Sequence, residues 1–319
     1  MKITSLRLIV QHLAFLVSTY GGGRGISLGA YVPCLSCPFI YSCSGFCYLL
    51  IFQRTLGTLL TPVIWLAGGD TGPLDWDNFI GFWKGLLIFS LLVILLGKSW
   101  CGWLCPFGLV QDWITRLRRL LRVRESELSL RAKERISLIK YALLLLLVVA
   151  LPVAASTGAL PQEFLLAFCG ICPAKAVMPL FGGDAQYLAL DYSSGAALGF
   201  SIALLLVTGA ILVASFVKDR FFCMICPMLA LINLYRRLYV MRLVKSPPSC
   251  RGCGNCRRTC SMDNDTVYRE RETAYVYDAD CMGCFKCSEG CPSDGSLSVK
   301  FGPFSLFRSS RKYAAGRSK

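Results

Sequence analysis

The sequence predicts an all-α polytopic membrane protein that carries a small α+β domain at its C-terminal end. Composition predicts the membrane part: 55% of the 319 residues are hydrophobic and only 17% are charged, and the mean hydropathy is +0.54, which is too apolar for an ordinary soluble domain. Two closely spaced cysteine runs after Pro247 and Pro248 predict the separate domain. We expect a membrane domain at 1–245, the cysteine-rich domain at 246–300 and a basic tail at 301–319.

Four segments are apolar enough to cross a bilayer: about 5–20, 79–97, 137–156 and 196–217. A spanning helix needs about 20 predominantly apolar residues, and the last three segments approach that length. The first is shorter, so a tilted or partly interfacial helix is the alternative there. A signal peptide is disfavoured because no small-residue cleavage site follows this segment.

Lysine and arginine predict the orientation of these spans. The segments after the second and fourth spans, 98–136 and 218–245, are rich in both residues, whereas 20–78 and 157–195 hold only Arg24, Arg54 and Lys175. The positive-inside rule then places both termini and the C-terminal domain on the cytoplasmic side of the inner membrane. Because the basic residues flank apolar spans, the net charge of +15 indicates lipid headgroups as partners and disfavours nucleic acid.

The two cysteine runs share the spacing Cys-x2-Cys-x2-Cys-x3-Cys. This spacing is typical of a bacterial-type 2[4Fe-4S] ferredoxin domain, in which three thiolates bind one cluster and the fourth reaches the other. A zinc ribbon is the rival, but it does not explain two triplets that are each followed by a fourth cysteine. The predicted ligand sets are Cys250, Cys253, Cys256 and Cys291 for one cluster, and Cys281, Cys284, Cys287 and Cys260 for the other.

The membrane part consists of two pseudo-repeats, each with a span, an outer Cys-x2-Cys-Pro loop, a second span and an inner cysteine pair followed by proline. The outer motifs occupy 34–38 and 169–173, and the inner motifs occupy 101–106 and 223–227. Each proline is expected to end a helix and to leave amide N–H groups free to face sulfur. Basic amphipathic stretches at 113–121 and 232–239 are expected to form interfacial helices.

Pseudo-symmetry would bring the cysteine pairs of the two repeats together. On the inner side Cys101, Cys105, Cys223 and Cys226 could hold a further [4Fe-4S] cluster, and buried free thiols are the alternative. On the outer side Cys34, Cys37, Cys169 and Cys172 could hold another, with Cys43 and Cys47 as alternative ligands. Disulfides or a thiol relay are the alternative for the outer cysteines, because an oxidising compartment favours them.

Several chemistries are excluded by what the sequence lacks. The single histidine, His12, cannot supply paired axial ligands, and no C-x-x-C-H motif occurs, so the chain ligates no haem of its own. There is no phosphate-binding loop, dinucleotide fingerprint or Ser-His-Asp arrangement. We therefore predict an electron-transfer subunit of an oxidoreductase complex without substrate chemistry of its own.

In its order of spans, the motifs CGWLCPFG and CMICP, and the two ferredoxin runs, the chain resembles the NapH/NosR/CcoG-type membrane polyferredoxins, and NapH most closely, over about residues 79–300. The resemblance implies electron transfer between a quinone pool or a soluble donor such as a ferredoxin and other redox subunits of a membrane complex. Cys223-x2-Cys226 is one residue shorter than the family's Cys-x3-Cys motif, and the outer cysteines lie outside its pattern.

Outer clusters would allow electrons to cross the membrane. The hydrocarbon core is roughly 30 Å thick, too wide for one productive hop, so the outer cysteine loops would have to dip inward or a bound quinone would have to bridge. Two other functions remain open at this point. One is an assembly factor that supplies electrons for cofactor insertion into a respiratory enzyme, and the other is a transmembrane dithiol relay.

Overall fold

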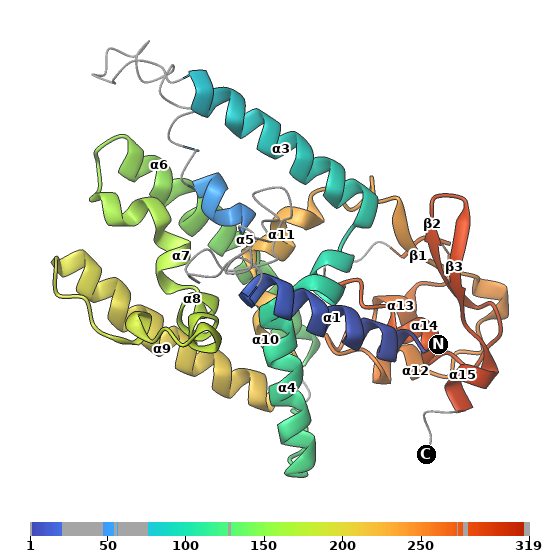
Figure 1. The fold of residues 1–319 in the computed structure, drawn as a ribbon. Helices are drawn as coiled ribbons and strands as arrows, with labels where there is room; N and C mark the ends of the chain where they lie inside the picture. The colour runs from blue at the N-terminus through green and yellow to red at the C-terminus, as the bar shows by residue number, and fades with distance from the viewer. Residues whose placement is uncertain are drawn as a thin grey trace.

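The computed structural model describes residues 2–20, 47–53, 56, 76–126, 129–272, 274–276 and 280–315. Long helices form the membrane part, and a small sheet with short helices forms the C-terminal part at one end of them (Figure 1). The predicted fold class is therefore confirmed. The cysteines at 34, 37 and 43 lie outside the described residues.

Helices of very different length make up the membrane part. In chain order they are α1 (Ile3–Tyr20), a helical turn at 48–53, α3 (Trp76–Leu96), α4 (Pro106–Leu120), α5 (Leu130–Leu143), α6 (Leu151–Ser156), α7 (Ala167–Ile171), α8 (Pro173–Val177), α9 (Gly195–Val217), α10 (Phe221–Ile225) and α11 (Pro227–Asn233). π-helical turns occupy Trp100–Leu104 and Leu144–Ala150, and 3₁₀ turns occupy Gln162–Leu166, Pro179–Gly182 and Gln186–Leu188.

Three described helices are long and apolar enough to cross a membrane: Ile3–Tyr20, Ala132–Ser156 and Gly195–Val217. The expected second span is a helix, α3, but its apolar part, Trp83–Leu96, is shorter than the others. Inside Ala132–Ser156 the π-helical turn precedes Pro152, whose missing N–H would otherwise break the regular ladder. Serine side chains start two of these helices, since Ser129 and Ser194 accept hydrogen bonds from the backbone N–H groups of Ala132 and Ala197.

A bent pair of helices lies between α6 and α9, at one of the outer cysteine loops that electron transfer across the membrane would require to dip inward. The segments Gln162–Ile171 and Pro173–Gly182 meet at an angle of 76° and form either a broken span or a re-entrant loop. The bend lies at Cys172, because Pro173 cannot continue the hydrogen-bond ladder of α7 and instead begins α8. The bend thus falls on the predicted outer motif.

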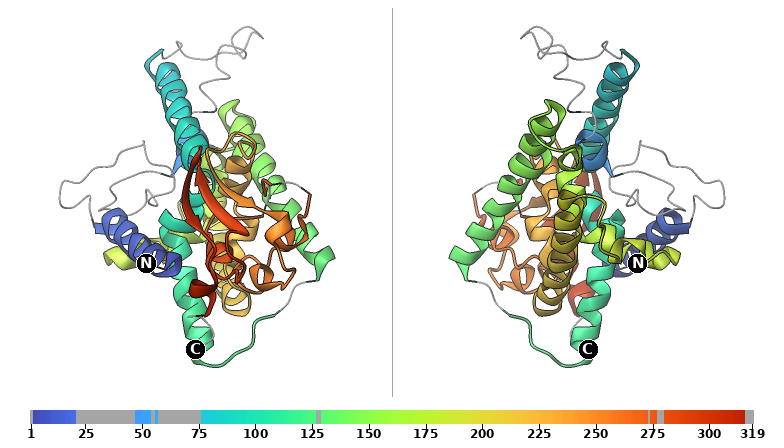
Figure 2. Two further views of the ribbon diagram at one scale, coloured as in Figure 1. Left: turned by 90° about the vertical axis from the view of Figure 1, so that its right-hand side faces the viewer. Right: turned by 90° about the vertical axis from the view of Figure 1, so that its left-hand side faces the viewer.

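The long helices alternate in direction relative to the C-terminal part (Figures 1 and 2). Helix α1 begins there, because Ile3 packs in its core and Thr4 donates two hydrogen bonds of 2.7 Å to the Glu289 carboxylate. Helices α3 and α9 end there, since Gly97 packs on Tyr239 and Lys218 pairs with Asp263 after α9. This alternation agrees with the predicted topology; the assignment of the two ends to membrane faces stays a prediction.

The pseudo-repeat is visible in the backbone that follows α3 and α9. Each long helix ends near a residue with positive φ, Gly97 (+56°) or Arg220 (+52°), and a short helical turn and a Cys-Pro helix start follow. Of the two expected interfacial helices, only the first segment is a regular helix, α4, and its position at the membrane surface stays a prediction. Residues 234–238 form turns, because the chain must leave α11 and reach the sheet, with the Val240 N–H bonded to the Ile94 carbonyl.

The C-terminal part is built around a three-stranded antiparallel sheet. Strands β1 (Met241–Lys245), β2 (Leu297–Phe301) and β3 (Phe304–Arg308) pair in the order β1-β2-β3. Short helices α12 (Asn255–Arg258), α13 (Thr266–Arg269), α14 (Lys286–Glu289) and α15 (Arg311–Ala315) complete it, with a 3₁₀ turn at Pro247–Ser249. The sheet draws residues from both sides of the boundaries expected at 246 and 300, because β1 pairs with β2.

Candidate iron-sulfur centres

Three of the four predicted Cys-Pro motifs lie within the described residues, and they share one conformation. Cys105, Cys172 and Cys226 each have φ between −62° and −70° and ψ between 115° and 123°, and each is the N-cap of a helix that begins with proline. Backbone N–H groups of the first turn, those of Gly108, Ala174 with Lys175, and Leu229, interact with the respective sulfurs. The N-terminus of a helix favours a thiolate.

The expected role of the prolines therefore needs correction. They do not free the amide groups of a preceding helix; each occupies the first position of the following helix, where its fixed φ fits and its missing N–H costs nothing. The N–H groups that face sulfur belong to that following helix.

The four inner cysteines converge from two pseudo-repeats, and each lies within electrostatic reach of others in the set: Cys101, Cys105, Cys223 and Cys226. Burial, and then the neighbouring Cys223, raises the pKa of the Cys105 thiol to about 11. Gln111 donates a hydrogen bond of 3.6 Å to the Cys223 sulfur. Four buried or partly buried thiols that oppose each other's ionisation need a compensating cation, and iron would supply that charge.

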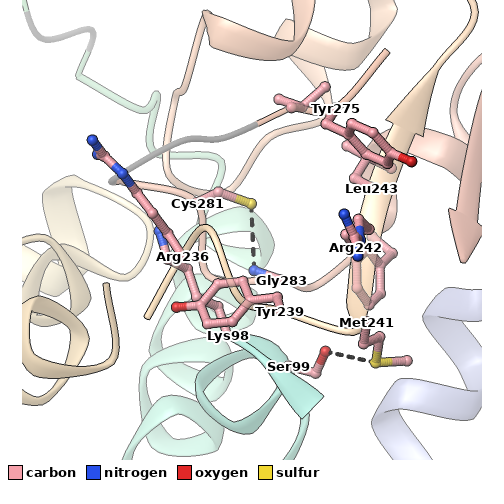
Figure 3. A pocket seen from close by; sticks show the side chains of 12 residues that line it. Lys98, Ser99, Arg236, Tyr239, Met241, Arg242, Leu243, Tyr275, Cys281 and Gly283 are labelled. Atoms are coloured by element: carbon pink, nitrogen blue, oxygen red, sulfur yellow. Dashed lines mark hydrogen bonds between the residues drawn. The ribbon is translucent and has the colours of Figure 1, made fainter. Parts of the chain in front are cut away.

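The second ferredoxin run gathers around Cys260 of the first run. Burial, and then Cys284 and Cys281, raises the pKa of the Cys260 thiol to about 12, and Cys287 lies within electrostatic reach of the same three cysteines. The backbone N–H of Gly283 donates to the Cys281 sulfur at 3.4 Å (Figure 3). The structure thus places Cys260 where a crossed ligand would be needed.

The first run follows the same backbone path as the second. Gly252 and Gly283 have φ of +67° and +66°, and the left-handed residues Gly254 and Phe285 each precede a short helix, α12 or α14. Cys256 lies within electrostatic reach of Cys291 and Cys250. Burial and these neighbours raise its pKa, so three of the four cysteines predicted for this cluster lie near one another.

No three His, Cys, Asp or Glu side chains of the described residues come together closely enough for a single metal ion. A [4Fe-4S] cluster binds one thiolate at each of its four irons, so its ligands are spread more widely than those of a single ion.

The second run and the inner cysteine loop touch backbone to backbone. A Cβ added to Gly102 would lie 2.7 Å from the Met282 carbonyl oxygen, and one added to Gly283 would lie 2.8 Å from the carbonyl carbon of Lys98. Trp103 donates a hydrogen bond of 3.2 Å to the Gly283 carbonyl. Two loops that carry cysteine ligands are therefore in direct contact, and both glycines are required by this approach.

A buried ion group stabilises the contact between the inner cysteine loop and the second run. We define it as Arg7, Asp112 and Arg220. Asp112 accepts hydrogen bonds from Arg7 (2.6 Å) and Arg220 (2.6 and 2.8 Å). Arg7 also donates to the Gly102 carbonyl at 2.8 Å, and Arg220 donates to the Met282 sulfur at 3.1 Å. Burial alone would raise the pKa of Asp112, but the two guanidinium groups hold it well below its usual range. The group carries a net positive charge between the inner cysteines and the second run.

The outer group in the described part of the chain consists of Cys47, Cys169 and Cys172. Cys47 lies within electrostatic reach of both others.

 

The outer group thus gathers three thiols from both pseudo-repeats: Cys47 from the first, and Cys169 and Cys172 from the second. Gln53 donates a hydrogen bond of 3.3 Å to the Cys169 sulfur and accepts one of 3.1 Å from the Phe168 N–H. Cys47, one of the two alternative ligands, is therefore beside the second-repeat pair. Cys34, Cys37 and Cys43 lie outside the described residues, so their part in an outer site stays a prediction.

The outer and inner groups adjoin one another. Cys172 lies within electrostatic reach of Cys226, and Cys47 within reach of Cys105. Members of both groups pack against one apolar cluster that includes Phe89. The bend at Cys172 thus brings the outer motif toward the inner one, and none of the described cysteines is disulfide-bonded.

Sequence reasoning missed the polar residues that support these groups. Arg7 and Gln11 both donate to the Gly102 carbonyl, while Gln53 and Gln111 donate to cysteine sulfurs. A signal was present, because Arg7 and Gln11 lie one helical turn apart in an apolar helix, and buried polar residues in such helices mark functional sites.

Comparisons with known proteins agree with this arrangement. A model of the 4Fe-4S binding domain matches residues 79–124 and 200–246, and a model of the 4Fe-4S dicluster domain matches residues 242–292. The two matches of the first model coincide with the α3–α4 and α9–α11 segments, and the second covers both ferredoxin runs. The prediction that the chain binds [4Fe-4S] clusters is therefore confirmed, and the additional clusters of the membrane part stay a prediction.

Three relatives illustrate the range of similar proteins. An uncharacterized protein of Methanocaldococcus jannaschii is 25% identical over 71% of this chain and 72% of its own length. The regulatory protein NosR of Pseudomonas aeruginosa is 26% identical over 76% of this chain but 34% of its own length, and the ferredoxin-type protein NapH of Escherichia coli is 27% identical over 66% and 65%. No solved structure matches the chain. The expected resemblance is confirmed: the chain is a relative of the NapH/NosR-type ferredoxin proteins of membranes and has an iron-sulfur electron-transfer role.

Proposed function

We propose that the chain relays electrons across the membrane through four thiolate sites arranged in series. The observation that carries this proposal is that each cysteine group adjoins the next, from the first ferredoxin run to the outer motif. The proposed ligand sets are Cys250, Cys253, Cys256 and Cys291; Cys260, Cys281, Cys284 and Cys287; Cys101, Cys105, Cys223 and Cys226; and Cys47, Cys169 and Cys172 with a fourth cysteine from 34, 37 or 43.

The residues present fit [4Fe-4S] clusters by their chemistry. Each proposed site combines cysteine thiols with backbone or amide N–H groups that face sulfur, as Gly283 does for Cys281 and Gln111 for Cys223, and such hydrogen bonds tune the potential. A bound [4Fe-4S] cluster takes up and releases one electron. The chain's own part is to hold the thiolates, exclude water and compensate charge, for which the net positive group around Asp112 is placed.

The series answers the difficulty posed by membrane thickness. A hydrocarbon core roughly 30 Å thick prevents a single hop, but the bend at Cys172 brings the outer motif next to Cys226. Non-helical backbone at membrane depth is tolerated where protein covers it, and Cys169 is buried among protein atoms. The bend and the burial of Cys169 support a route between the inner and the outer site.

Partners and orientation follow from the proposal. Electron transfer requires redox partners, and we assign the ferredoxin side to the cytoplasmic face of the inner membrane because the basic segments lie there. Donor and acceptor could each stand on either side, since a relay works in both directions.

Liposomes loaded with dithionite test the relay when ferricyanide is added outside under anaerobic conditions. We expect ferricyanide to be reduced much faster than in protein-free liposomes, and the Cys172→Ser variant to lose this activity while its ferredoxin clusters remain reducible. Equal rates in the variant and the unchanged protein would contradict the proposal, because the outer site would then not be part of the route.

A further inference from the structure

The two ferredoxin runs differ in how much of their sulfur faces solvent. Among the described cysteines, Cys253 of the first run is the one that is exposed. Its counterpart in the second run, Cys284, is buried. Electron exchange with a partner in solution requires a short approach to a cluster, so the edge of the 250–254 loop is the accessible end of the proposed series.

Arginine side chains surround this edge. Arg258 donates a hydrogen bond of 2.8 Å to the Cys253 carbonyl, and the guanidinium of Arg271 lies 3.3 Å from the position of a Cβ on Gly252. Arg251 lies in the loop itself, and all three are exposed. We call Arg251, Arg258 and Arg271 the arginine rim. They come from separate segments, so the fold gathers positive charge around the exposed sulfur.

Acidic residues nearby offset only part of this charge. Asp265 is shared by Arg257 and Arg269, at 2.8 and 3.6 Å. Asp294 accepts a hydrogen bond from the Arg311 N–H and interacts electrostatically with Arg251. Glu270 and Glu272 flank Arg271 in the sequence. The carboxylates of this region, Asp265, Glu270, Glu272 and Asp294, are still fewer than its arginines, which are Arg251, Arg257, Arg258, Arg269, Arg271 and Arg311. This region therefore keeps an excess of positive charge.

A polar cavity of about 460 Å³ lies beside the rim. It is lined by Gly254, Arg258 and Cys260, together with Arg257, Lys218, Tyr268, Glu125 and Asp263. Gly254 belongs to the loop of the first run, while Cys260 belongs to the proposed second site. The cavity therefore provides a recess for a partner's side chains next to both ferredoxin sites.

We propose that the arginine rim is the docking surface for a small acidic protein that carries one electron, such as an acidic ferredoxin. This inference rests on the proposed function. In the exchange the reduced carrier loses one electron and the chain gains one, or the reverse, and no bond or proton needs to move. Complementary charge steers such encounters and makes them sensitive to salt. The rim lies in the C-terminal part beyond the ends of α3 and α9, which favours a protein partner over lipid (Figure 1).

The test uses the full chain in nanodiscs of neutral lipid, with an acidic [2Fe-2S] ferredoxin as the probe. We expect its dissociation constant to rise about tenfold or more when salt is increased from low to physiological levels, and by a similar factor in the triple variant Arg251→Glu, Arg258→Glu, Arg271→Glu. The double variant Arg251→Glu, Arg271→Glu keeps the bond from Arg258 to Cys253 and should show most of the effect.

The matched control replaces with glutamate three exposed arginines in the last turns of α4 and just after it: Arg116, Arg122 and Arg124. Helix α4 extends away from the C-terminal part (Figure 1). It should leave probe binding unchanged. Unchanged binding in the triple variant overturns the docking surface. Iron content and the extent of reduction by excess dithionite separate this failure from a failure of the proposed function.

Discussion

The two ferredoxin runs have one spacing and one backbone path but opposite surroundings. Gly252 of the first run faces only the flexible end of Arg271, whereas Gly283 of the second run faces the backbone of Lys98 and Ser99. Cys253 is exposed and Cys284 is buried. Two motifs with the same spacing therefore have different surroundings: the first faces solvent, and the second packs against the inner cysteine loop.

The difference teaches that the order of sites depends on contacts made outside the motifs. The second run is fixed by Trp103 and by the ion group around Asp112, which belong to the membrane part. The first run has the arginine rim in the corresponding position. Changing these surroundings should affect the two runs unequally.

The largest effect is expected when the ion group loses its anion. Asp112→Asn leaves Arg7 and Arg220 buried without a carboxylate, which should lower the free energy of unfolding by about 3–5 kcal/mol. Denaturant titration followed by tryptophan fluorescence measures this. The control Arg119→Gln alters an ion pair whose guanidinium is exposed and should cost less than about 1 kcal/mol. Equal losses in the two variants would show that the buried ion group does not stabilise the fold more than an exposed ion pair.

A methyl group at the contact between the two loops should have the next largest effect. Alanine at positive φ lowers the free energy of unfolding by roughly 1–2 kcal/mol. Gly252→Ala and Gly295→Ala should cost little more than this, because Gly252 faces only the end of the Arg271 side chain and Gly295, at φ +67°, has open space around it. Gly283→Ala adds a clash with the backbone of Lys98 and Ser99. It should therefore lower the temperature of thermal unfolding more than the other two variants do, and it should slow electron transfer from the first run to the inner site. Three similar variants would indicate that the loops do not touch.

Charge in the ion group should shift reduction potentials in opposite directions. Removing a negative charge with Asp112→Asn favours the added electron and should raise the potential of the sites beside Arg220. Arg220→Gln removes a positive charge and should lower it. A redox titration followed by electron paramagnetic resonance measures both, and shifts of the same sign would show that structural change rather than charge dominates.

The smallest effect concerns the order in which iron is lost. Because Cys253 is exposed and Cys284 is buried, a chelator should remove iron first from the first run. Alkylation followed by mass spectrometry should then label Cys253 before Cys284. Simultaneous labelling would mean that the two sites do not differ in access.

Sequence predicted most of the cysteine chemistry, because ligand spacing is a local property: Cys281, Cys284 and Cys287 are grouped by three-residue steps. It also predicted the repeat, since Cys105 and Cys226 each precede proline. It could not predict the bend at Cys172 or the contact of Gly102 with Met282, because these depend on residues that are far apart in the chain. The ion group of Arg7, Asp112 and Arg220 is long-range for the same reason.

Counting iron and sulfide in anaerobically purified protein tests the four-site series most directly. The account predicts about 16 iron atoms per chain, four for each [4Fe-4S] cluster, and a loss of about four in Cys101→Ser or Cys172→Ser. About eight iron atoms that neither substitution changes would contradict the series and leave only the ferredoxin sites.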